Sequence, residues 1–249
     1  MGKIIGLIGY PLSHSYSPKI WKKLFEQEDL SEFSYQLFEI SDIRQVSRLL
    51  KDESIIGFNV TIPYKREILN YLHDLTPEAQ GVGAVNTVVK AYGSKLIGHN
   101  TDAVAFEISL LKFLNGWVPS NAMVLGTGGS AAAIKYVFEK QRIPYILVSR
   151  TKKNADVFTY EEVNQSAFEY PDIIVNTTPL GMYPSIHEHP PIDFKKIKPK
   201  SYCFDLIYNP EKTLFLQKCE NQKAYVQNGL EMLHLQARKA WEFISKHSL

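Results

Sequence analysis

The stretch Ala122-Met123-Val124-Leu125-Gly126-Thr127-Gly128-Gly129-Ser130-Ala131 joins an apolar strand to a glycine-rich turn and then to a helix. This order predicts a turn that binds the phosphates of a dinucleotide. Gly126 permits a tight bend, Gly128 lets the backbone approach a pyrophosphate, and Ala131 lets the helix pack closely on the strand. The helix N-terminus contributes N–H groups and the positive end of its dipole. An ordinary glycine-rich loop is the alternative interpretation.

The next expected strand, residues 145–149, ends in the sequence Ser149-Arg150-Thr151-Lys152-Lys153. An enzyme that uses NAD usually has an acidic residue here for the ribose 2′-hydroxyl, whereas an arginine accommodates a 2′-phosphate. No carboxylate occurs between this strand and Asp156, so Arg150 favours NADP (NADPH) as the cofactor. A solvated basic turn is the alternative interpretation of the same residues.

On both sides of the glycine-rich turn, apolar strands alternate with helices, which predicts parallel sheets with helices on both faces. Beyond the turn, strands are expected at 145–149, 172–177, 202–206 and 223–226, and helices at 128–141, 211–219 and 230–246. Before it, strands are expected at 3–8, 35–38, 57–60, 84–90 and 95–99, and helices at 17–28, 42–51, 63–72 and 102–115. Ile62, Leu69 and Leu72 are expected on a buried face of the helix at 63–72.

The two series of elements predict two domains with a boundary near residue 102. The first domain comprises residues 1–102 and the second residues 103–228. We also expect the last helix, beginning at Gly229, to return to the first domain, so that residues 229–249 complete it. Periodicity alone does not require that return.

The composition is that of an ordinary globular protein, with 45% hydrophobic and 22% charged residues and a formal net charge of +2. No apolar run reaches the ~18–20 residues that cross a bilayer. The N-terminal apolar stretch is broken by glycine and proline, unlike a signal peptide, so we expect a cytoplasmic protein without a membrane partner. The small net charge predicts no nucleic-acid partner. Cys203 and Cys219 are too few for a disulfide framework.

Two polar segments of the first domain follow predicted strands and therefore belong at the carboxyl edge of a sheet, where ligands of α/β proteins bind. One contains Thr61 and Lys65, and the other ends at Asp102. Hydride transfer to a ketone produces an alkoxide, which needs a proton donor and positive potential. A lysine ammonium supplies both, and a carboxylate can hold it in position. Taken singly, each residue is more typical of a surface charge.

Several ordered segments resemble those of the shikimate dehydrogenase family, whose members reduce 3-dehydroshikimate to shikimate with NADPH. They are residues 9–18, 59–65, 83–87, 100–102, 176–182, 205–210 and 228–233 with Gln236, beside the glycine-rich turn and Arg150. The resemblance implies a two-domain α/β fold, in which an N-terminal substrate domain precedes a Rossmann-like NADP-binding domain. It also implies a role in chorismate and aromatic amino acid biosynthesis, with shikimate or 3-dehydroshikimate as the small-molecule partner.

The resemblance assigns roles residue by residue. Lys65 is implied as the catalytic residue and Asp102 as its partner, with no metal. The implied substrate ligands are Ser15, Ser17, Thr61, Asn86, Tyr208 and Gln236. The implied cofactor contacts are Gly126, Thr127, Gly128, Gly129, Ser130, Ala131, Ser149, Arg150, Thr151, Thr177, Leu206 and Gly229.

Two alternative functions remain open from the sequence. One is a relative that also oxidises quinate or uses NAD, against which Arg150 argues. The other is a regulatory protein that binds NADP without turnover, against which the combination of Lys65 and Asp102 argues. The protein is expected to be a monomer or a homodimer, and the sequence does not choose between them.

The segment between Arg150 and Asp172 is shorter than the family usually has. We expect a strand at 156–160 to be kept and the helix before it to be lost. The pair of histidines in His187-Glu188-His189 resembles a metal site, but it lies in a polar loop with no third ligand in the sequence nearby.

Overall fold

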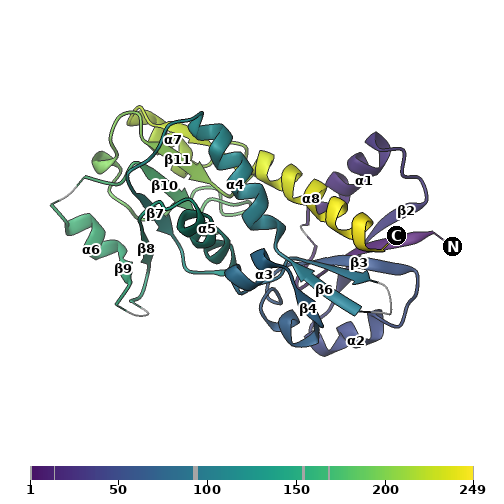
Figure 1. Ribbon diagram of the computed structural model, residues 1–249. Helices are drawn as coiled ribbons and strands as arrows, with labels where there is room; N and C mark the ends of the chain where they lie inside the picture. The colour runs from purple at the N-terminus through teal and green to yellow at the C-terminus, as the bar shows by residue number, and fades with distance from the viewer. Residues whose placement is uncertain (1, 14, 92–94, 153–154, 168, 249) are drawn as a thin grey trace. The chain divides into compact units, whose positions relative to one another are not determined.

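The computed structural model describes residues 2–13, 15–91, 95–152, 155–167 and 169–248. It divides into two compact units, unit 1 with Met1–Ala105 and His234–Leu249, and unit 2 with Phe106–Leu233 (Figure 1). The chain enters unit 2 within helix α4 (Thr101–Leu114) and re-enters unit 1 within helix α8 (Leu230–Ser248). None of the described helices is both long enough and apolar enough to cross a membrane.

Unit 1 is built around a six-stranded sheet, sheet A, with the strand order β2-β1-β3-β5-β6-β4. β5 runs antiparallel to both neighbours while the other pairs are parallel, so the expectation of a purely parallel sheet is wrong for this unit. Only a few residues join β5 to β6, too few for the crossover that a parallel pair requires. The elements before α4 are β1 (Lys3–Gly9), α1 (Ser17–Gln27), β2 (Phe33–Glu39), η1 (Ile43–Gln45), α2 (Val46–Leu49), β3 (Ile55–Val60), η2 (Glu67–Tyr71), β4 (Asp74–Leu75), α3 (Pro77–Val82), β5 (Thr87–Ala91) and β6 (Lys95–His99).

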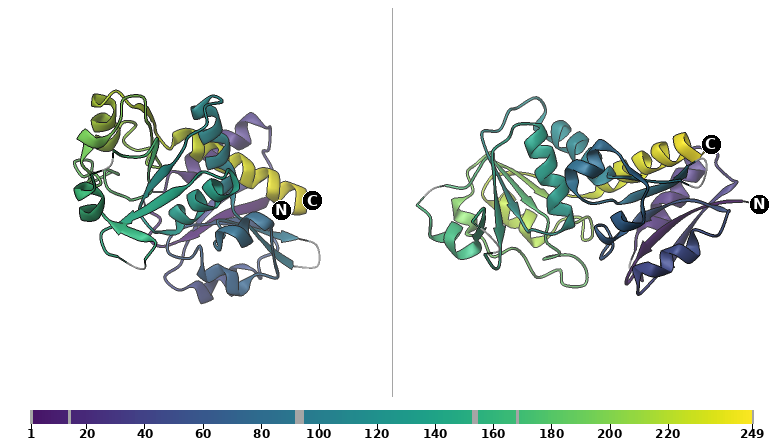
Figure 2. Two further views of the ribbon diagram at one scale, coloured as in Figure 1. Left: turned by 60° about the vertical axis from the view of Figure 1, so that its left-hand side comes forward. Right: turned by 60° about the horizontal axis from the view of Figure 1, so that its bottom comes forward.

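Helices cover both faces of sheet A (Figures 1 and 2). On one face, Trp241 of α8 packs edge-on against Phe25 of α1 and Phe33 of β2, with ring centroids 6.0 and 4.8 Å apart. A β-carbon at Gly57 would lie 3.2 Å from Ile244, so α8 lies directly on β3. The opposite face, towards α2 and η2, has its own buried cluster, which includes Ile8, Val46, Ile55, Phe58, Val60, Tyr64, Ile68 and Val88.

The segment expected as a helix at 42–51 is only the 3₁₀ turn η1 followed by one turn, α2. Asp42 caps it by accepting a hydrogen bond from the Arg44 N–H at 2.9 Å. The strand expected from residue 84 begins at Thr87. Residue 14, and residues 92–94 between β5 and β6, lie outside the described residues.

The segment expected as a helix at 63–72 is wrong for most of its length, because only η2 is helical. The carbonyl of Lys65 accepts a hydrogen bond from the N–H of Val85, in a neighbouring loop, instead of one from the following turn. Ile62, expected in the core, is 73% exposed. The loop therefore presents Lys65 from an irregular backbone anchored to the sheet.

Unit 2 is built around sheet B, six parallel strands in the order β12-β11-β10-β7-β8-β9. Numbered from β7 as the first strand of the unit, this order is 6-5-4-1-2-3, the order of a Rossmann-like dinucleotide-binding fold. The order reverses between β7 and β10, where ligands of such sheets bind beyond the strand ends. The elements after α4 are β7 (Ala122–Leu125), α5 (Gly129–Lys140), β8 (Tyr145–Ser149), β9 (Val157–Thr159), α6 (Tyr160–Gln165), β10 (Ile173–Asn176), η4 (Phe194–Lys196), β11 (Tyr202–Asp205), α7 (Leu214–Asn221) and β12 (Tyr225–Gln227).

Strand residues of sheet B alternate between two buried faces, as the period of two in a strand requires. Phe204 of β11 lies 5.3 Å from the ring of Phe106 on α4, which in turn contacts Phe138 on α5. The adjacent Cys203 lies on the opposite face in a cluster with Phe215 of α7. Both cysteines are buried and free, as small apolar residues would be. Together the two units form the predicted two-domain α/β fold.

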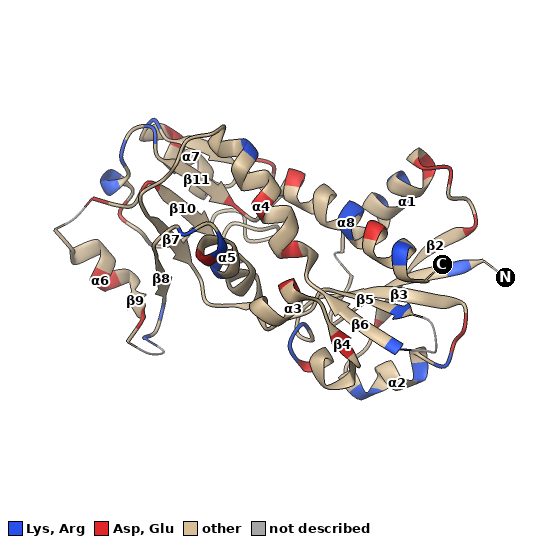
Figure 3. Ribbon diagram, in the orientation of Figure 1, with Lys and Arg blue, Asp and Glu red and all other residues tan. Residues whose placement is uncertain are grey.

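Charged residues of both signs are interspersed along the chain in both units (Figure 3). Some join neighbouring helices, as Lys140 of α5 does with Glu107 of α4 at 2.7 Å, and Arg238 of α8 with Glu28 after α1 at 2.8 Å. Exposed pairs of this kind contribute about 0–1 kcal/mol each. The apolar clusters therefore dominate the stability of each unit.

The segment after Arg150 confirms the expectation of a shortened connection. Among the described residues between β8 and β9 there is no helix, and the strand is kept as β9. The short helix α6 follows this strand and was not expected. A capping box begins it, since the Thr159 hydroxyl accepts from the Glu162 N–H while the Glu162 carboxylate accepts from the Thr159 N–H.

Asp205, at the end of β11, is fully buried and ties three segments of unit 2 together. Its carboxylate accepts hydrogen bonds from the Asn176 amide at 3.0 Å, the Thr213 hydroxyl at 2.6 Å and the Ile207 N–H at 3.0 Å. Thr213 also caps α7, which therefore begins later than the expected residue 211. Burial raises the pKa of Asp205 to about 7, although the three donors oppose the rise.

Between the ordinary aspartate pKa and about 7, the folded protein binds a proton at Asp205 that the unfolded chain does not bind. We therefore expect the free energy of unfolding to fall as the pH rises from about 5 to about 8. In the variant Asp205→Asn this fall should be smaller by about 2–3 kcal/mol, because the asparagine side chain does not titrate. Urea unfolding of both proteins across that range measures the difference. Parallel pH curves for the two proteins would contradict the expectation.

Candidate functional site

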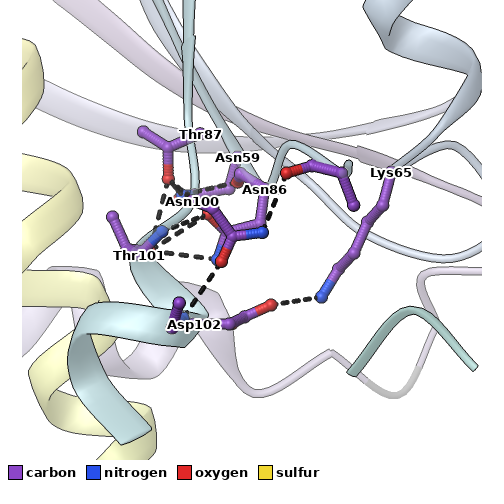
Figure 4. Close-up of polar contacts among 9 residues, drawn as sticks. Asn59, Lys65, Asn86, Thr87, Asn100, Thr101 and Asp102 are labelled. Atoms are coloured by element: carbon purple, nitrogen blue, oxygen red, sulfur yellow. Dashed lines mark hydrogen bonds and ion pairs between the residues drawn. The ribbon is translucent and has the colours of Figure 1, made fainter. Parts of the chain in front are cut away.

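Five polar residues of unit 1 are buried where strands β3, β5 and β6 begin or end (Figure 4). The five residues are Asn59 in β3, Asn86 and Thr87 at the start of β5, Asn100 after β6 and Thr101 at the start of α4. Buried polar groups must find hydrogen-bond partners. Four of these residues find one another, whereas Asn100 bonds to backbone groups.

Asn100 determines where helix α4 begins. Its side-chain oxygen accepts from the Ala103 N–H at 3.0 Å, which is an N-cap bond, and its amide donates to the Ala84 carbonyl at 2.9 Å. Because the cap fixes the first turn, Asp102 lies at the helix N-terminus, where the positive end of the helix dipole stabilises a carboxylate.

Lys65 and Asp102 form an ion pair, with the Lys65 Nζ 2.6 Å from the Asp102 Oδ2 (Figure 4). The two side chains are only 17% and 14% exposed, so water screens the pair less than it screens pairs at the surface. Residues 37 positions apart in sequence meet here because both follow strands of sheet A. A lysine ammonium has three N–H groups, so it can donate to a ligand while Asp102 holds it.

The orientation of the Asn86 amide is determined by the Thr101 backbone. The N–H of Thr101 donates to the Asn86 Oδ1 at 2.8 Å, and the hydroxyls of Thr87 and Thr101 also lie within hydrogen-bonding distance of that oxygen. The amide nitrogen of Asn86 donates to the Thr101 hydroxyl at 3.0 Å. With its oxygen saturated, Asn86 can offer a ligand an N–H but not a carbonyl.

The remaining predicted substrate residues of unit 1 come from the loops after β1 and β3 and from α8. The Ser15 hydroxyl accepts from the Ser17 N–H at 3.3 Å, at the start of α1. The Thr61 N–H donates to the Ile8 carbonyl, which places the loop after β3 beside the end of β1. Gln236 lies in the part of α8 that belongs to unit 1.

The glycine-rich turn of unit 2 is closed by Thr177 at the end of β10. The Thr177 hydroxyl donates to the Leu125 carbonyl at 2.7 Å, across the position where the strand order reverses. Gly126 has a φ of +113°, and a β-carbon there would lie 2.5 Å from the Thr177 hydroxyl. Both the backbone conformation and the close approach therefore require glycine at this position.

Gly128 is different, because a β-carbon there would meet no protein atom within 4 Å. No protein contact requires this glycine, so the space it leaves suits an approaching ligand. Gly128 is the N-cap of α5, and no side chain caps that helix. The N–H groups of the first turn, including Gly129, Ser130 and the buried Ala131, suit a phosphate. Thr127 lies within the turn itself, so these residues fit a dinucleotide phosphate.

The predicted contacts for the adenosine half follow β8, which pairs directly with β7. Ser149 ends that strand, and Arg150 and Thr151 are exposed beyond it. Lys152 is paired with Glu162 at 2.7 Å. Arg150 therefore lies at the same edge of sheet B as the glycine-rich turn.

Leu206 and Gly229 are packed against each other in unit 2. A β-carbon at Gly229 would lie 2.1 Å from the Leu206 carbonyl oxygen, and the Gly229 N–H donates to the Ile207 carbonyl at 3.0 Å. Tyr208 belongs to the same unit and is half-buried.

The structure also reveals four polar residues to which the sequence motifs assign no role, namely Tyr35, Asn59, Thr87 and Thr101. For Asn59 and Thr87, the one sequence signal is a polar group within an otherwise apolar strand. Among the described residues, no three His, Cys, Asp or Glu side chains are grouped to hold a metal ion.

Comparisons with known proteins agree with this architecture. Residues 7–88 match the family model described as the shikimate dehydrogenase substrate binding domain. The chain is 40% identical to the shikimate dehydrogenase (NADP(+)) of Clostridium beijerinckii, over 95% of this chain and 90% of that protein.

Two solved structures superpose closely on the chain. A shikimate dehydrogenase in complex with NADP+ has a TM-score of 0.86 at 30% identity, covering 98% of this chain and 90% of the other. The enzyme of Thermus thermophilus, in complex with NADP(H) and shikimate, has a TM-score of 0.83 at 28% identity, covering 98% and 94%. The chain therefore belongs to the shikimate dehydrogenase family of oxidoreductase enzymes.

Proposed function

We propose that this protein catalyses the reversible reduction of 3-dehydroshikimate to shikimate with NADPH, in chorismate and aromatic amino acid biosynthesis. The observation that carries the proposal is the shielded Lys65–Asp102 ion pair, at the strand edge of the unit that contains the substrate-domain match. Family members are named for NADP(+), and one is solved with both NADP(H) and shikimate. Unit 1 is proposed to bind the substrate and unit 2 the cofactor.

In the proposed reaction, the reduced nicotinamide supplies a hydride to the ketone carbon. The Lys65 ammonium donates a proton to the oxygen that becomes the hydroxyl, and its charge stabilises the alkoxide as it develops. Asp102 keeps the ammonium in place through one N–H and leaves the others for the substrate. In the oxidation of shikimate, Lys65 in its neutral form accepts the proton.

The other proposed contacts follow from the donors that each side chain has left. The Ser15 and Ser17 hydroxyls donate to the substrate carboxylate, and the remaining Asn86 N–H donates to a ring oxygen. Thr61 and Gln236 are proposed as further substrate ligands. The roles of Tyr208, Leu206 and Gly229 stay predictions. So do the cytoplasmic location and the choice between monomer and homodimer.

The proposed cofactor site combines the turn of residues 126–131 for the pyrophosphate with Ser149, Arg150 and Thr151 for the adenosine 2′-phosphate. Thr177, which closes the turn, is proposed to contact the cofactor beside it. An arginine guanidinium can form paired hydrogen bonds to a phosphate, which a ribose hydroxyl does not offer. This difference is the basis for proposing NADP over NAD.

Spectrophotometric assay of nicotinamide reduction tests the proposal directly. The purified protein should reduce NADP+ in the presence of shikimate, more slowly with quinate, and more slowly when NAD+ replaces NADP+. Equal rates with quinate or with NAD+ would favour the broader alternative enzyme. Tight NADP+ binding without turnover of either acid would favour the regulatory alternative.

The variant Lys65→Ala should lose about 10²–10⁴-fold in kcat, because it removes the proposed proton donor. The KM for shikimate should change far less, since the serine and amide contacts remain. Steady-state kinetics of Lys65→Ala and of Asp102→Asn measure both quantities. An unchanged kcat in Lys65→Ala would remove Lys65 from the mechanism.

The variant Arg150→Ala should weaken NADPH binding by at least about tenfold more than NADH binding, because only NADPH carries the 2′-phosphate. Lys152→Ala is the matched control, since Lys152 is a neighbouring cation already paired with Glu162. Titration of each cofactor by fluorescence measures the affinities. Equal losses for the two cofactors in Arg150→Ala would show that Arg150 does not contact the phosphate.

The variant Gly128→Ala should keep the thermal stability of the wild type but bind NADP+ at least about tenfold more weakly. The new methyl group meets no protein atom, and it occupies the space through which the pyrophosphate approaches. Gly126→Ala, in contrast, should destabilise unit 2 because of its positive φ and the contact with Thr177. Wild-type affinity in Gly128→Ala would place the phosphates elsewhere.

A further inference from the structure

Tyr35 of strand β2 contacts the polar group of unit 1 although it carries no proposed role so far. Its hydroxyl lies 3.0 Å from the Asn59 Oδ1. The ring is stacked on the fully buried Trp21, with centroids 4.8 Å apart and planes 14° from parallel. The position of the hydroxyl is therefore fixed by the apolar packing behind it.

The direction of each hydrogen bond from Tyr35 onwards can be worked out from the backbone. The Asn59 amide nitrogen donates to the Asn86 backbone carbonyl at 3.3 Å and to the Thr87 hydroxyl at 3.1 Å. Both amide hydrogens of Asn59 are then used, and its Oδ1 must face Tyr35 as an acceptor. Tyr35 is consequently the donor in that bond.

The same reasoning continues to Asn86. The Thr87 hydroxyl accepts from Asn59, so its own hydrogen is available for the Asn86 Oδ1 at 3.2 Å. Tyr35, Asn59, Thr87 and Asn86 thus form a row of three hydrogen bonds, in which each residue donates to the next. Hydrogen bonds arranged in this sense polarise and strengthen one another. Figure 4 shows the part of this row from Asn59 to Asn86.

The Tyr35 hydroxyl stays protonated at any physiological pH, because burial raises its pKa well above the ordinary value for tyrosine. Its single hydrogen is committed to Asn59. The hydroxyl is therefore linked, through Asn59 and Thr87, to Asn86, which is proposed to contact the substrate.

We propose that Tyr35 is a positioning residue for the substrate, whose hydroxyl holds the Asn59 amide and, through Asn59 and Thr87, supports the orientation that the Thr101 N–H gives the Asn86 amide. The proposal rests on the proposed function, because it assumes that Asn86 binds shikimate. Without the hydroxyl, the buried Asn59 Oδ1 loses its donor, which leaves an unsatisfied acceptor inside the unit. The contact of Asn59 with Thr87, and through it the support of Asn86, is then weakened.

The variant Tyr35→Phe removes only the hydroxyl and keeps the ring that stacks on Trp21. We expect the KM for shikimate to rise about tenfold, as the loss of one buried donor implies. The kcat should change less than about threefold and the KM for NADP+ should stay unchanged, because Lys65 and the cofactor residues keep their contacts. Steady-state kinetics with each substrate varied in turn measure these three constants.

Tyr170→Phe is a matched control in unit 2, where the Tyr170 hydroxyl donates to the Asn164 Oδ1 at 2.6 Å. It removes the same kind of bond from a buried tyrosine that has no role in the proposed site. Both variants should lose comparable thermal stability, whereas only Tyr35→Phe should raise the KM for shikimate. Thr87→Val should also raise the KM for shikimate. The double variant Tyr35→Phe/Thr87→Val should raise this KM little more than the stronger of the two single variants.

An unchanged KM for shikimate in Tyr35→Phe, beside a loss of stability like that of Tyr170→Phe, would show that Tyr35 is merely structural. Equal rises in the KM values for shikimate and NADP+ would also overturn the proposal. Fully additive effects of Tyr35→Phe and Thr87→Val on the KM for shikimate would show that Tyr35 does not act through Thr87. If the wild-type protein does not oxidise shikimate at all, the proposed function fails first and the role of Tyr35 fails with it.

Discussion

The hydrogen bond from the Thr101 backbone N–H to the Asn86 side-chain oxygen is the contact on which the arrangement of unit 1 depends. It joins the end of β6 and the start of α4 to the loop before β5, in a place where water cannot satisfy either group. The start of α4, and with it the position of Asp102, follows from this bond and from the Asn100 cap. Lys65 then finds its partner because its own loop is bonded to the same segment, through Val85.

Unit 2 uses the same principle with different residues. Its glycine-rich turn follows β7, and the hydroxyl of Thr177 closes it from the neighbouring β10. Asp205 joins the ends of β10 and β11 to the start of α7 with three accepted hydrogen bonds. In both units, polar groups at strand ends satisfy one another, and these bonds fix the position of the neighbouring segments.

Much of the fold could be predicted from the chain alone, for reasons that are local. The strands at 122–125 and 145–149, the helix after Gly128 and the kept strand after Arg150 follow from apolar patterning and glycine positions. The prediction failed at 63–72, where Lys65 bonds to a distant loop and Ile62 is exposed. It also failed for the direction of β5, which depends on a short connection and not on periodicity.

The sequence by itself determined the two-unit α/β plan, the glycine-rich turn with its required glycine at 126, and the family, because short motifs encode local backbone geometry and specific donors. It could name Lys65 and Asp102 together only through the family motifs. Only the tertiary structure decided that their atoms lie 2.6 Å apart, that Asn86 is turned with its oxygen inward, and that Tyr35 stands at the head of a row of bonds. The physical reason is that the direction of a hydrogen bond depends on which backbone groups contact each other across strands. Those contacts are determined by the packing of segments that are distant in sequence.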